Sequence, residues 1–259
     1  MNAKLSPLQD SKIHHTDSYK DIFNQRGQSY HFAMTQFPEA RTQEFKSLID
    51  MLNLSDGDNL IDIPSGGAYL SHYINSEVKI YSVDDAEQFI KSDPSKNKYC
   101  CSTTTTPFES YSFNKAYSLA GSHHMPSKNE FYCEVHRLLK PGGIFAYADV
   151  AQGSLIDDFL NVFVNKYNSM GHVGDFLNIE DTCEDLESSG FTVNYSSVCN
   201  YQWDFTNQEQ AIAFFRNLFG LDLATDDDIK KSFDQYLNGR NKYNRYYIDW
   251  QLLQFKAIA

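Results

Sequence analysis

The chain has 259 residues, 41% of them apolar, which is enough for one large α/β domain with a buried core. Its 22 basic and 34 acidic residues leave a net charge of -12. That charge argues against nucleic acid as a partner, because affinity for a phosphate backbone comes mostly from lysine and arginine. It argues equally against anionic membrane surfaces.

No apolar run approaches the roughly 18–20 residues of a membrane span, and the polar stretch 1–17 lacks the apolar centre of a signal peptide. The five cysteines include no Cys-x-x-Cys pair, which favours reduced thiols. We therefore expect a cytoplasmic protein, either a monomer or a homodimer. Its expected partner is a small molecule, with no nucleic acid and no membrane.

Residues 1–54 are predicted to form an N-terminal helical cap, and 55–259 the main domain. Within the cap, 1–17 are expected to be weakly ordered, whereas 18–54 carry helical patterning. A helical insertion at about 204–242 is predicted inside the main domain. We interpret this insertion as a lid or substrate-binding cap over one end of the sheet.

The apolar run 59–63 is broken by Pro64 and by two glycines, Gly66 and Gly67. The pattern predicts a strand at about 58–63, a tight turn, and a helix from about 67 to 75. Such a turn brings backbone N–H groups and the positive end of a helix close to a ligand. Asp62, near the strand end, is a candidate to orient the loop or to bind a nucleotide-like cofactor, unless it only caps the turn.

A second strand at 78–83 ends at Asp84 and Asp85, and Asp84 lies 22 residues beyond Asp62. A carboxylate about 20 residues after a glycine-rich turn can accept hydrogen bonds from a ribose diol. We assign Asp84 to the ribose and Asp85 to the N-cap of a short helix, although the two roles could be exchanged. The turn does not match G-x-G-x-x-G, so the pattern that cradles a pyrophosphate is missing.

The remaining strands alternate with helices as far as residue 150, which implies a parallel sheet with right-handed crossovers. The predicted elements are strands at 99–102, 113–119 and 144–150 with a helix at 128–139, then helices at 155–169 and 179–189, a strand at 191–198, helices at 207–219 and 226–237, and a last strand at 245–257.

The segment LLKPGGIFA at 138–146, with SFNKAYS at 112–118 before it, resembles the class I S-adenosylmethionine-dependent methyltransferase family. In that family a helix ending in this way leads into the fifth strand. The resemblance implies a Rossmann-like doubly wound α/β sheet, mostly parallel with an antiparallel last strand. It also implies S-adenosyl-L-methionine as cofactor and S-adenosyl-L-homocysteine as product.

Carried over by position, the resemblance assigns parts of the cofactor to four loops. The methionine part would contact Asp62, Pro64, Ser65 and Gly66. The ribose would contact Asp84, with Asp85 beside it, and the adenine would contact Thr103 in the loop 102–104. The sulfonium would lie over Leu119 and Ala120. The chain departs from the family at Pro64, where glycine is usual, at the threonines near the adenine, and at Asn114, where aspartate is usual.

His123 and His124 follow the fourth strand and are the candidate catalytic residues, with His124 slightly preferred. A neutral imidazole there could remove a proton from the acceptor. Packing is the alternative role, since methyl transfer can proceed by proximity and orientation alone. The other histidines are scattered in the sequence, and no metal is expected.

In related methyltransferases an N-terminal helix often closes over the site, which makes Tyr19, Tyr30 and Arg26 candidate substrate residues. Either Arg26 or Arg41 could pair with a carboxylate there. Ordinary helix packing explains them equally well. The aromatic residues of the insertion and its flanks suggest a partly apolar acceptor, although core packing explains most of them: Tyr201, Trp203, Phe214, Phe215, Phe219 and Trp250.

The sequence thus predicts methyl transfer to oxygen, nitrogen or carbon of a small molecule, such as a secondary metabolite or a carrier-bound acyl intermediate. One alternative is intramolecular cyclisation or a pericyclic or lyase reaction with the same cofactor. The other is a non-catalytic binding protein of the same fold.

Overall fold

The computed structural model describes residues 19–125 and 127–259. The expected weak order of 1–17 falls outside this part of the chain. Among the described residues, no helix is both long enough and apolar enough to cross a membrane.

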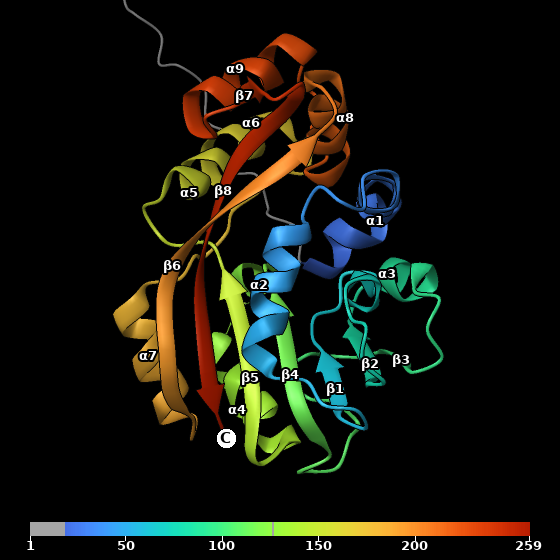
Figure 1. Ribbon diagram of the computed structural model, residues 1–259, viewed down its shortest axis with the longest axis vertical. Coiled ribbons are helices and arrows are strands. Elements are labelled where there is room, and N and C mark those ends of the chain that lie inside the picture. The colour runs from blue at the N-terminus through green and yellow to red at the C-terminus, as the bar shows by residue number, and fades with distance from the viewer. Residues whose placement is uncertain (1–18, 126) are drawn as a thin grey trace, which may run out of the picture.

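The described strands form one twisted sheet in the order β3-β2-β1-β4-β5-β8-β6, with β7 paired to β8 (Figure 1). Strands β1 to β5 run parallel, whereas β8 is antiparallel to both β5 and β6. This confirms the predicted doubly wound, mostly parallel sheet. The strands are β1 (Asn59–Asp62), β2 (Lys79–Asp84), β3 (Lys98–Cys100), β4 (Phe113–Leu119), β5 (Leu139–Asp149), β6 (Thr192–Phe205), β7 (Arg240–Lys242) and β8 (Arg245–Ile258).

Helices cover both faces of the sheet, because successive residues of a strand point to opposite faces. Leu60 packs in the same core as α2 (Thr42–Leu52), while Ile61 packs with α4 (Lys128–Leu138) and α7 (Ile179–Ser188). Helix α1 (Tyr19–Gln36) lies to one side, where its Phe23 packs on Phe89 of α3 (Glu87–Ser92).

The long strands β6 and β8 continue past the parallel strands and carry a helical layer at one end of the sheet (Figure 1). Between them in sequence lie α8 (Gln208–Leu218) and α9 (Asp226–Tyr236), within the segment predicted as an insertion. A continuous helical stretch before α7 joins this layer. It consists of α5 (Leu155–Asp158), the π-helical η3 (Phe159–Val164) and α6 (Asn165–Tyr167). The division into a cap and a main domain stays a prediction.

The prediction of a helix at about 67–75 is wrong. Gly66, Gly67 and Ala68 have φ values of 55°, 105° and 63°, a left-handed run that cannot start an α-helix. Only one 3₁₀ turn, η1 (Tyr69–His72), follows. The expected helix N-terminus, with its positive dipole end, is therefore missing from this loop.

Candidate functional site

The carboxyl ends of β1 and β4 meet where the strand order reverses, the usual ligand position in a doubly wound sheet. Three hollows lie here. We call them the central pocket, lined by Asp62, Ser65 and Leu119; the edge pocket, lined by Asp85, Thr103 and His124; and the histidine chamber, lined by His123, His172 and Trp250.

The loop after β1 is held against the neighbouring strands. Ser65 N–H donates to the Val83 carbonyl at 2.8 Å, and Gly66 N–H donates to Asp84 Oδ2 at 2.9 Å. On the β4 side, a Cβ on Gly121 would stand 2.5 Å from Cγ of Pro64. Pro64 therefore fits this loop only because the facing residue is glycine.

Asp84 is fully buried and its carboxylate already accepts three hydrogen bonds. The donors are Gly66 N–H, Ala86 N–H and the hydroxyl of Tyr19, all at 2.9 Å. Burial raises the pKa of Asp84 to about 7, although these hydrogen bonds favour its ionised form. Tyr19 lines both the central and the edge pocket, so its ring separates them at the predicted ribose position.

The predicted N-cap role of Asp85 is wrong. Ala86 occupies the N-cap position of α3, and its N–H is satisfied by Asp84 instead. Asp85 lines the edge pocket together with Thr103, and its Oδ1 is buried with no hydrogen-bond partner among the described residues. The structure therefore leaves Asp85, unlike the hydrogen-bonded Asp84, with an acceptor oxygen available to a polar ligand.

Asp62 is 3% exposed in the central pocket, and no described residue forms a hydrogen bond with its carboxylate. Burial, and then repulsion from Asp84, raise its pKa well above the usual value. Nearby, Ser65 Oγ is also buried without a partner. A pocket that holds an unpaired carboxylate and an unsatisfied hydroxyl fits a ligand with positive and polar groups.

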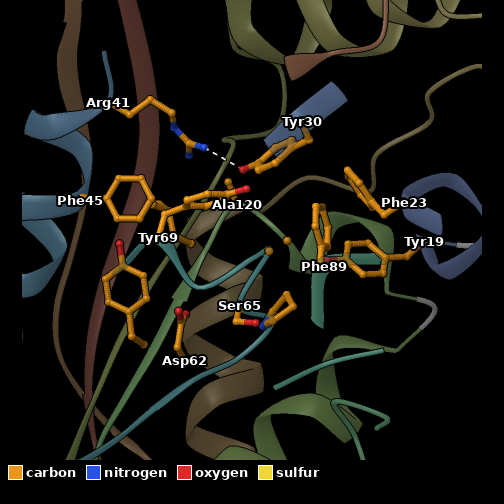
Figure 2. A pocket seen from close by; sticks show the side chains of 15 residues that line it. Tyr19, Phe23, Tyr30, Arg41, Phe45, Asp62, Ser65, Tyr69, Phe89 and Ala120 are labelled. Atoms are coloured by element: carbon orange, nitrogen blue, oxygen red, sulfur yellow. Dashed lines mark hydrogen bonds between the residues drawn. The ribbon is translucent and has the colours of Figure 1, made fainter. Parts of the chain in front are cut away.

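The central pocket and the histidine chamber share a wall. Both are lined by Phe23, Tyr30, Arg41 and Ala120. Arg41 donates a hydrogen bond to the Tyr30 hydroxyl at 3.0 Å, which fixes that ring between the two spaces (Figure 2). A ligand in one space therefore lies next to a ligand in the other.

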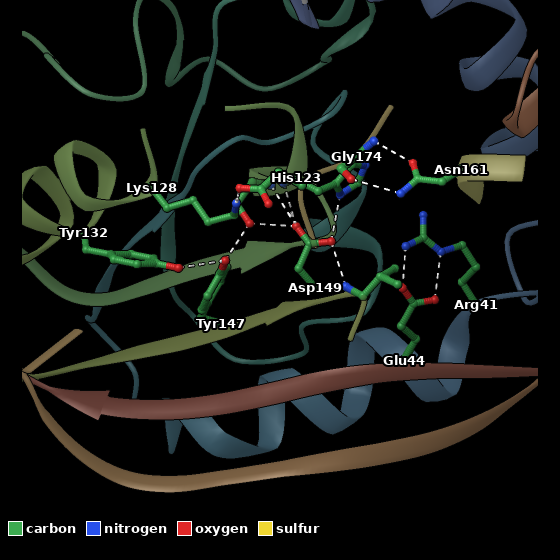
Figure 3. Close-up of polar contacts among 12 residues, drawn as sticks. Arg41, Glu44, His123, Lys128, Tyr132, Tyr147, Asp149, Asn161 and Gly174 are labelled. Carbon is green, nitrogen blue, oxygen red and sulfur yellow. Dashed lines mark hydrogen bonds and ion pairs between the residues drawn. The ribbon is translucent and has the colours of Figure 1, made fainter. Parts of the chain in front are cut away.

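His123 is held by a buried carboxylate that sequence analysis missed. Asp149, at the end of β5, lies 2.7 Å from His123 Nδ1 and also accepts the N–H groups of Ser122 and His123 (Figure 3). Burial opposes the charge of Asp149, but the His123 ring, the Ser122 hydroxyl and the Val150 N–H keep its pKa below the usual value. The only sequence signal was an acidic residue at the end of a predicted strand.

His172 comes from the loop after α6 and meets both predicted histidines, although sequence analysis treated it as scattered. Its ring centroid lies 5.6 Å from that of His123 and 5.1 Å from that of His124. Burial, followed by charge repulsion from His123, lowers the pKa of both His124 and His172 well below the usual value. Both rings are therefore neutral at pH 7.

Arg26, a predicted substrate residue, lines the chamber and is half-buried. One Nη donates to the Leu218 carbonyl, but Nε has no partner, and no described carboxylate forms a salt bridge with it. Burial lowers its pKa to about 10. Trp203, Phe219 and Trp250 form an aromatic wall of the chamber, whereas Tyr201, Phe214 and Phe215 pack in the core.

Of the other predicted substrate residues, Tyr30 reaches the chamber, whereas Tyr19 lies over Asp84 and between the two cofactor-side pockets. Sequence analysis also missed the pair of Arg41 and Glu44. Glu44 is fully buried, pairs with Arg41, and accepts a hydrogen bond from Trp203 Nε1 at 2.9 Å. This contact links α2 to β6 behind the chamber.

Comparisons with known proteins identify the domain and the fold that carry this site. Residues 61–147 match a family described as a methyltransferase domain. The chain is 27% identical over 135 residues to 24-methylenesterol C-methyltransferase 2 of Arabidopsis thaliana, an alignment that covers 46% of this chain. It spans 37% of that relative, little more than a third of its length.

Two solved structures share the fold. Phosphoethanolamine N-methyltransferase 2 of Haemonchus contortus, solved with S-adenosyl-L-methionine, has a TM-score of 0.62 at 15% identity, over 94% of this chain and 60% of that one. The (4+2)-cyclase SpnF has a TM-score of 0.58 at 14% identity, over 91% and 95%. The matched domain and the sheet order show that residues 61–147 belong to a methyltransferase domain and that the chain has the fold of the class I S-adenosylmethionine-dependent methyltransferases.

Proposed function

We propose that this protein binds S-adenosylmethionine across the central and edge pockets and methylates a small molecule held in the histidine chamber. The wall shared by the central pocket and the chamber carries the proposal, because it would put donor and acceptor side by side at Tyr30 and Ala120. The unpaired carboxylate of Asp62 suits a cationic cofactor. When bound, the cofactor supplies a methyl group on a sulfonium.

The chain's own residues would mainly align the acceptor and handle its proton. His123 and His124 remain the candidates for the proton acceptor. The hydrogen bond from His123 to Asp149 favours His123 over His124, the reverse of the order expected from sequence, because it fixes the ring and leaves Nε2 free.

The chamber also favours a class of acceptor. Its aromatic wall suits an apolar body, and the unpaired Arg26 suits an anionic oxygen. The Arabidopsis relative is named for a sterol substrate, which fits the apolar wall. The unpaired cation favours an acceptor that also carries a carboxylate, a phosphate or a phenolate.

Calorimetry with S-adenosylmethionine and S-adenosylhomocysteine tests the cofactor site. We expect binding by the wild type and at least tenfold weaker binding by Asp84→Ala. Asp158→Ala, at an exposed aspartate that lines none of the three pockets, is the matched control and should bind like the wild type. No binding by the wild type would overturn the proposal. Unchanged affinity in Asp84→Ala would show that the ribose lies elsewhere.

Two observations support a second candidate function, a cyclisation or another reaction with the same cofactor. The loop at Pro64 departs from the family, and the fold is also that of a (4+2)-cyclase. Mass spectrometry after incubation with the cofactor and candidate acceptors separates the reactions. S-adenosylhomocysteine supports methyl transfer, methylthioadenosine supports attack within the cofactor, and an isomerised acceptor with unconsumed cofactor supports cyclisation.

A further inference from the structure

Three imidazoles converge on one point in the wall of the histidine chamber. His123 and His124 follow β4, and His172 comes from the loop after α6, about fifty residues away in the chain. One ring nitrogen from each lies within 4.8 Å of the other two. Around one tetrahedral ion the ligand nitrogens stand about 3.4 Å apart, so small side-chain rotations would close the set.

The first ligand already has the partner that a metal-binding histidine usually has. His123 Nδ1 lies 2.7 Å from Asp149 Oδ1, so its Nε2 is the nitrogen left free. Such a carboxylate fixes the tautomer and the ring orientation and makes the free nitrogen a better ligand. Asp149 is itself held by the N–H groups of Ser122 and Val150 (Figure 3).

The third ligand is buried and lacks a partner. His172 is 6% exposed, and its Nδ1 has no hydrogen-bond partner among the described residues. Its backbone is nevertheless fixed, since His172 N–H donates to Asn165 Oδ1 at 2.9 Å. Asn161 likewise forms two hydrogen bonds with Gly174 in the same loop. A buried ring nitrogen on such a firmly held loop, with no hydrogen-bond partner, is available to bind a ligand.

We propose that His123, His124 and His172 bind one divalent transition-metal ion of the kind that prefers imidazole ligands, such as Zn²⁺, Fe²⁺ or Ni²⁺. Three neutral nitrogens leave at least one coordination position free. All three residues line the histidine chamber, so that position would face the acceptor. This replaces the sequence-based expectation of no metal.

The positive charge of Arg26 favours an anionic ligand beside the bound ion. Arg26 lines the same chamber and forms no salt bridge with a described carboxylate, although the charge of Asp222 acts on it from a greater distance. A bound dication and this guanidinium would repel each other unless an anion lay between them. A hydroxyl of the acceptor that lost its proton there would meet both as an anionic oxygen. The ion would make that hydroxyl more acidic and, since it would occupy Nε2 of His123, would take the place of that imidazole in handling the proton. This last role rests on the proposed methyl transfer, but ion binding does not.

Zn²⁺ titration of the chelator-treated full chain, without cofactor, tests the site by calorimetry and metal analysis. The starting protein carries His14→Ala and His15→Ala, because that adjacent pair could add background binding. We expect one ion per chain, at least tenfold weaker binding in His172→Ala, and unchanged binding in His72→Ala, whose histidine is exposed away from the chamber. Circular dichroism checks that each variant is folded.

Arg26→Gln should change the Zn²⁺ affinity in the opposite direction from His172→Ala. Removing the repulsion should tighten Zn²⁺ binding several-fold, whereas damage to the fold would weaken Zn²⁺ binding. An absence of Zn²⁺ binding in the starting protein, or equal binding in His172→Ala, would overturn the proposal. Because these titrations contain no cofactor, their failure would leave the cofactor-binding test of the proposed function intact.

Discussion

In the cofactor site proposed here, Tyr19 occupies the place that the ribose would need. Its hydroxyl donates to Asp84, which the ribose hydroxyls would use instead, and its ring lies between the central and edge pockets. Asp84 thus has a hydrogen-bond partner whether or not a cofactor is present. Cofactor binding must therefore replace the contact with Tyr19.

Removing that competing hydroxyl should tighten cofactor binding. A hydrogen bond to a charged group contributes about 1.5–3 kcal/mol, so Tyr19→Phe should raise the affinity for S-adenosylhomocysteine about tenfold or more. Calorimetry measures this, and Tyr243→Phe, at an 82% exposed tyrosine, serves as the control. Weaker binding in Tyr19→Phe would show that the hydroxyl contacts the cofactor rather than competing with it.

The raised pKa of Asp84 predicts a pH dependence of the same affinity. With a pKa of about 7, Asp84 is mostly ionised at pH 8 and mostly protonated at pH 6. Only the ionised form accepts hydrogen bonds from both ribose hydroxyls, so affinity should fall about tenfold from pH 8 to pH 6. Asp84→Asn should therefore flatten most of the change. Burial also raises the pKa of Asp62, which faces the same pocket, so an equal slope in Asp84→Asn would assign the pH dependence to another group of the pocket.

At the scale of elements, the chamber depends on a buried ion pair rather than on a single strand. Arg41 precedes α2, and Glu44 lies in its first turn. Glu44 joins Arg41 to Trp203 of β6, so α2 and the long antiparallel strand are fixed to each other. Removing one charge would leave the other buried and unpaired.

Glu44→Gln should accordingly cost about 3–5 kcal/mol of unfolding free energy, because Arg41 is only 6% exposed. Urea unfolding measures the loss. The comparison variant is Glu87→Gln, which removes the exposed pair with Lys91 at 3.3 Å and should cost less than about 1 kcal/mol. Similar losses in the two variants would show that the buried pair is not a link between the elements.

Across the whole molecule, α1 connects the two sides of the site. Its first residue, Tyr19, reaches the cofactor-side pockets, and Arg26, two turns later, reaches the chamber and the end of α8. Since an α-helix moves largely as a unit, displacement of Tyr19 should also shift the position of Arg26. Cofactor binding and the shape of the chamber are therefore expected to be coupled.

Tryptophan fluorescence should report that coupling. The chain has two tryptophans, Trp203 and Trp250, which stack with ring centroids 4.1 Å apart in the chamber wall. Neither lines the central or the edge pocket. We expect S-adenosylhomocysteine to change their emission at the concentration where calorimetry shows binding. Binding without a fluorescence change would mean that α1 does not transmit the displacement.

The sequence by itself determined the sheet, because the alternation of apolar strands with helical segments and the LLKPGG motif are local patterns. The same patterns placed Asp62, Asp84 and the paired histidines at the strand ends. Only the tertiary structure showed that 67–75 is not a helix, since two glycines permit several backbone conformations and packing selects one. It alone brought Asp149 and His172 to His123, because contacts between residues far apart in the chain leave no periodic signal in the sequence.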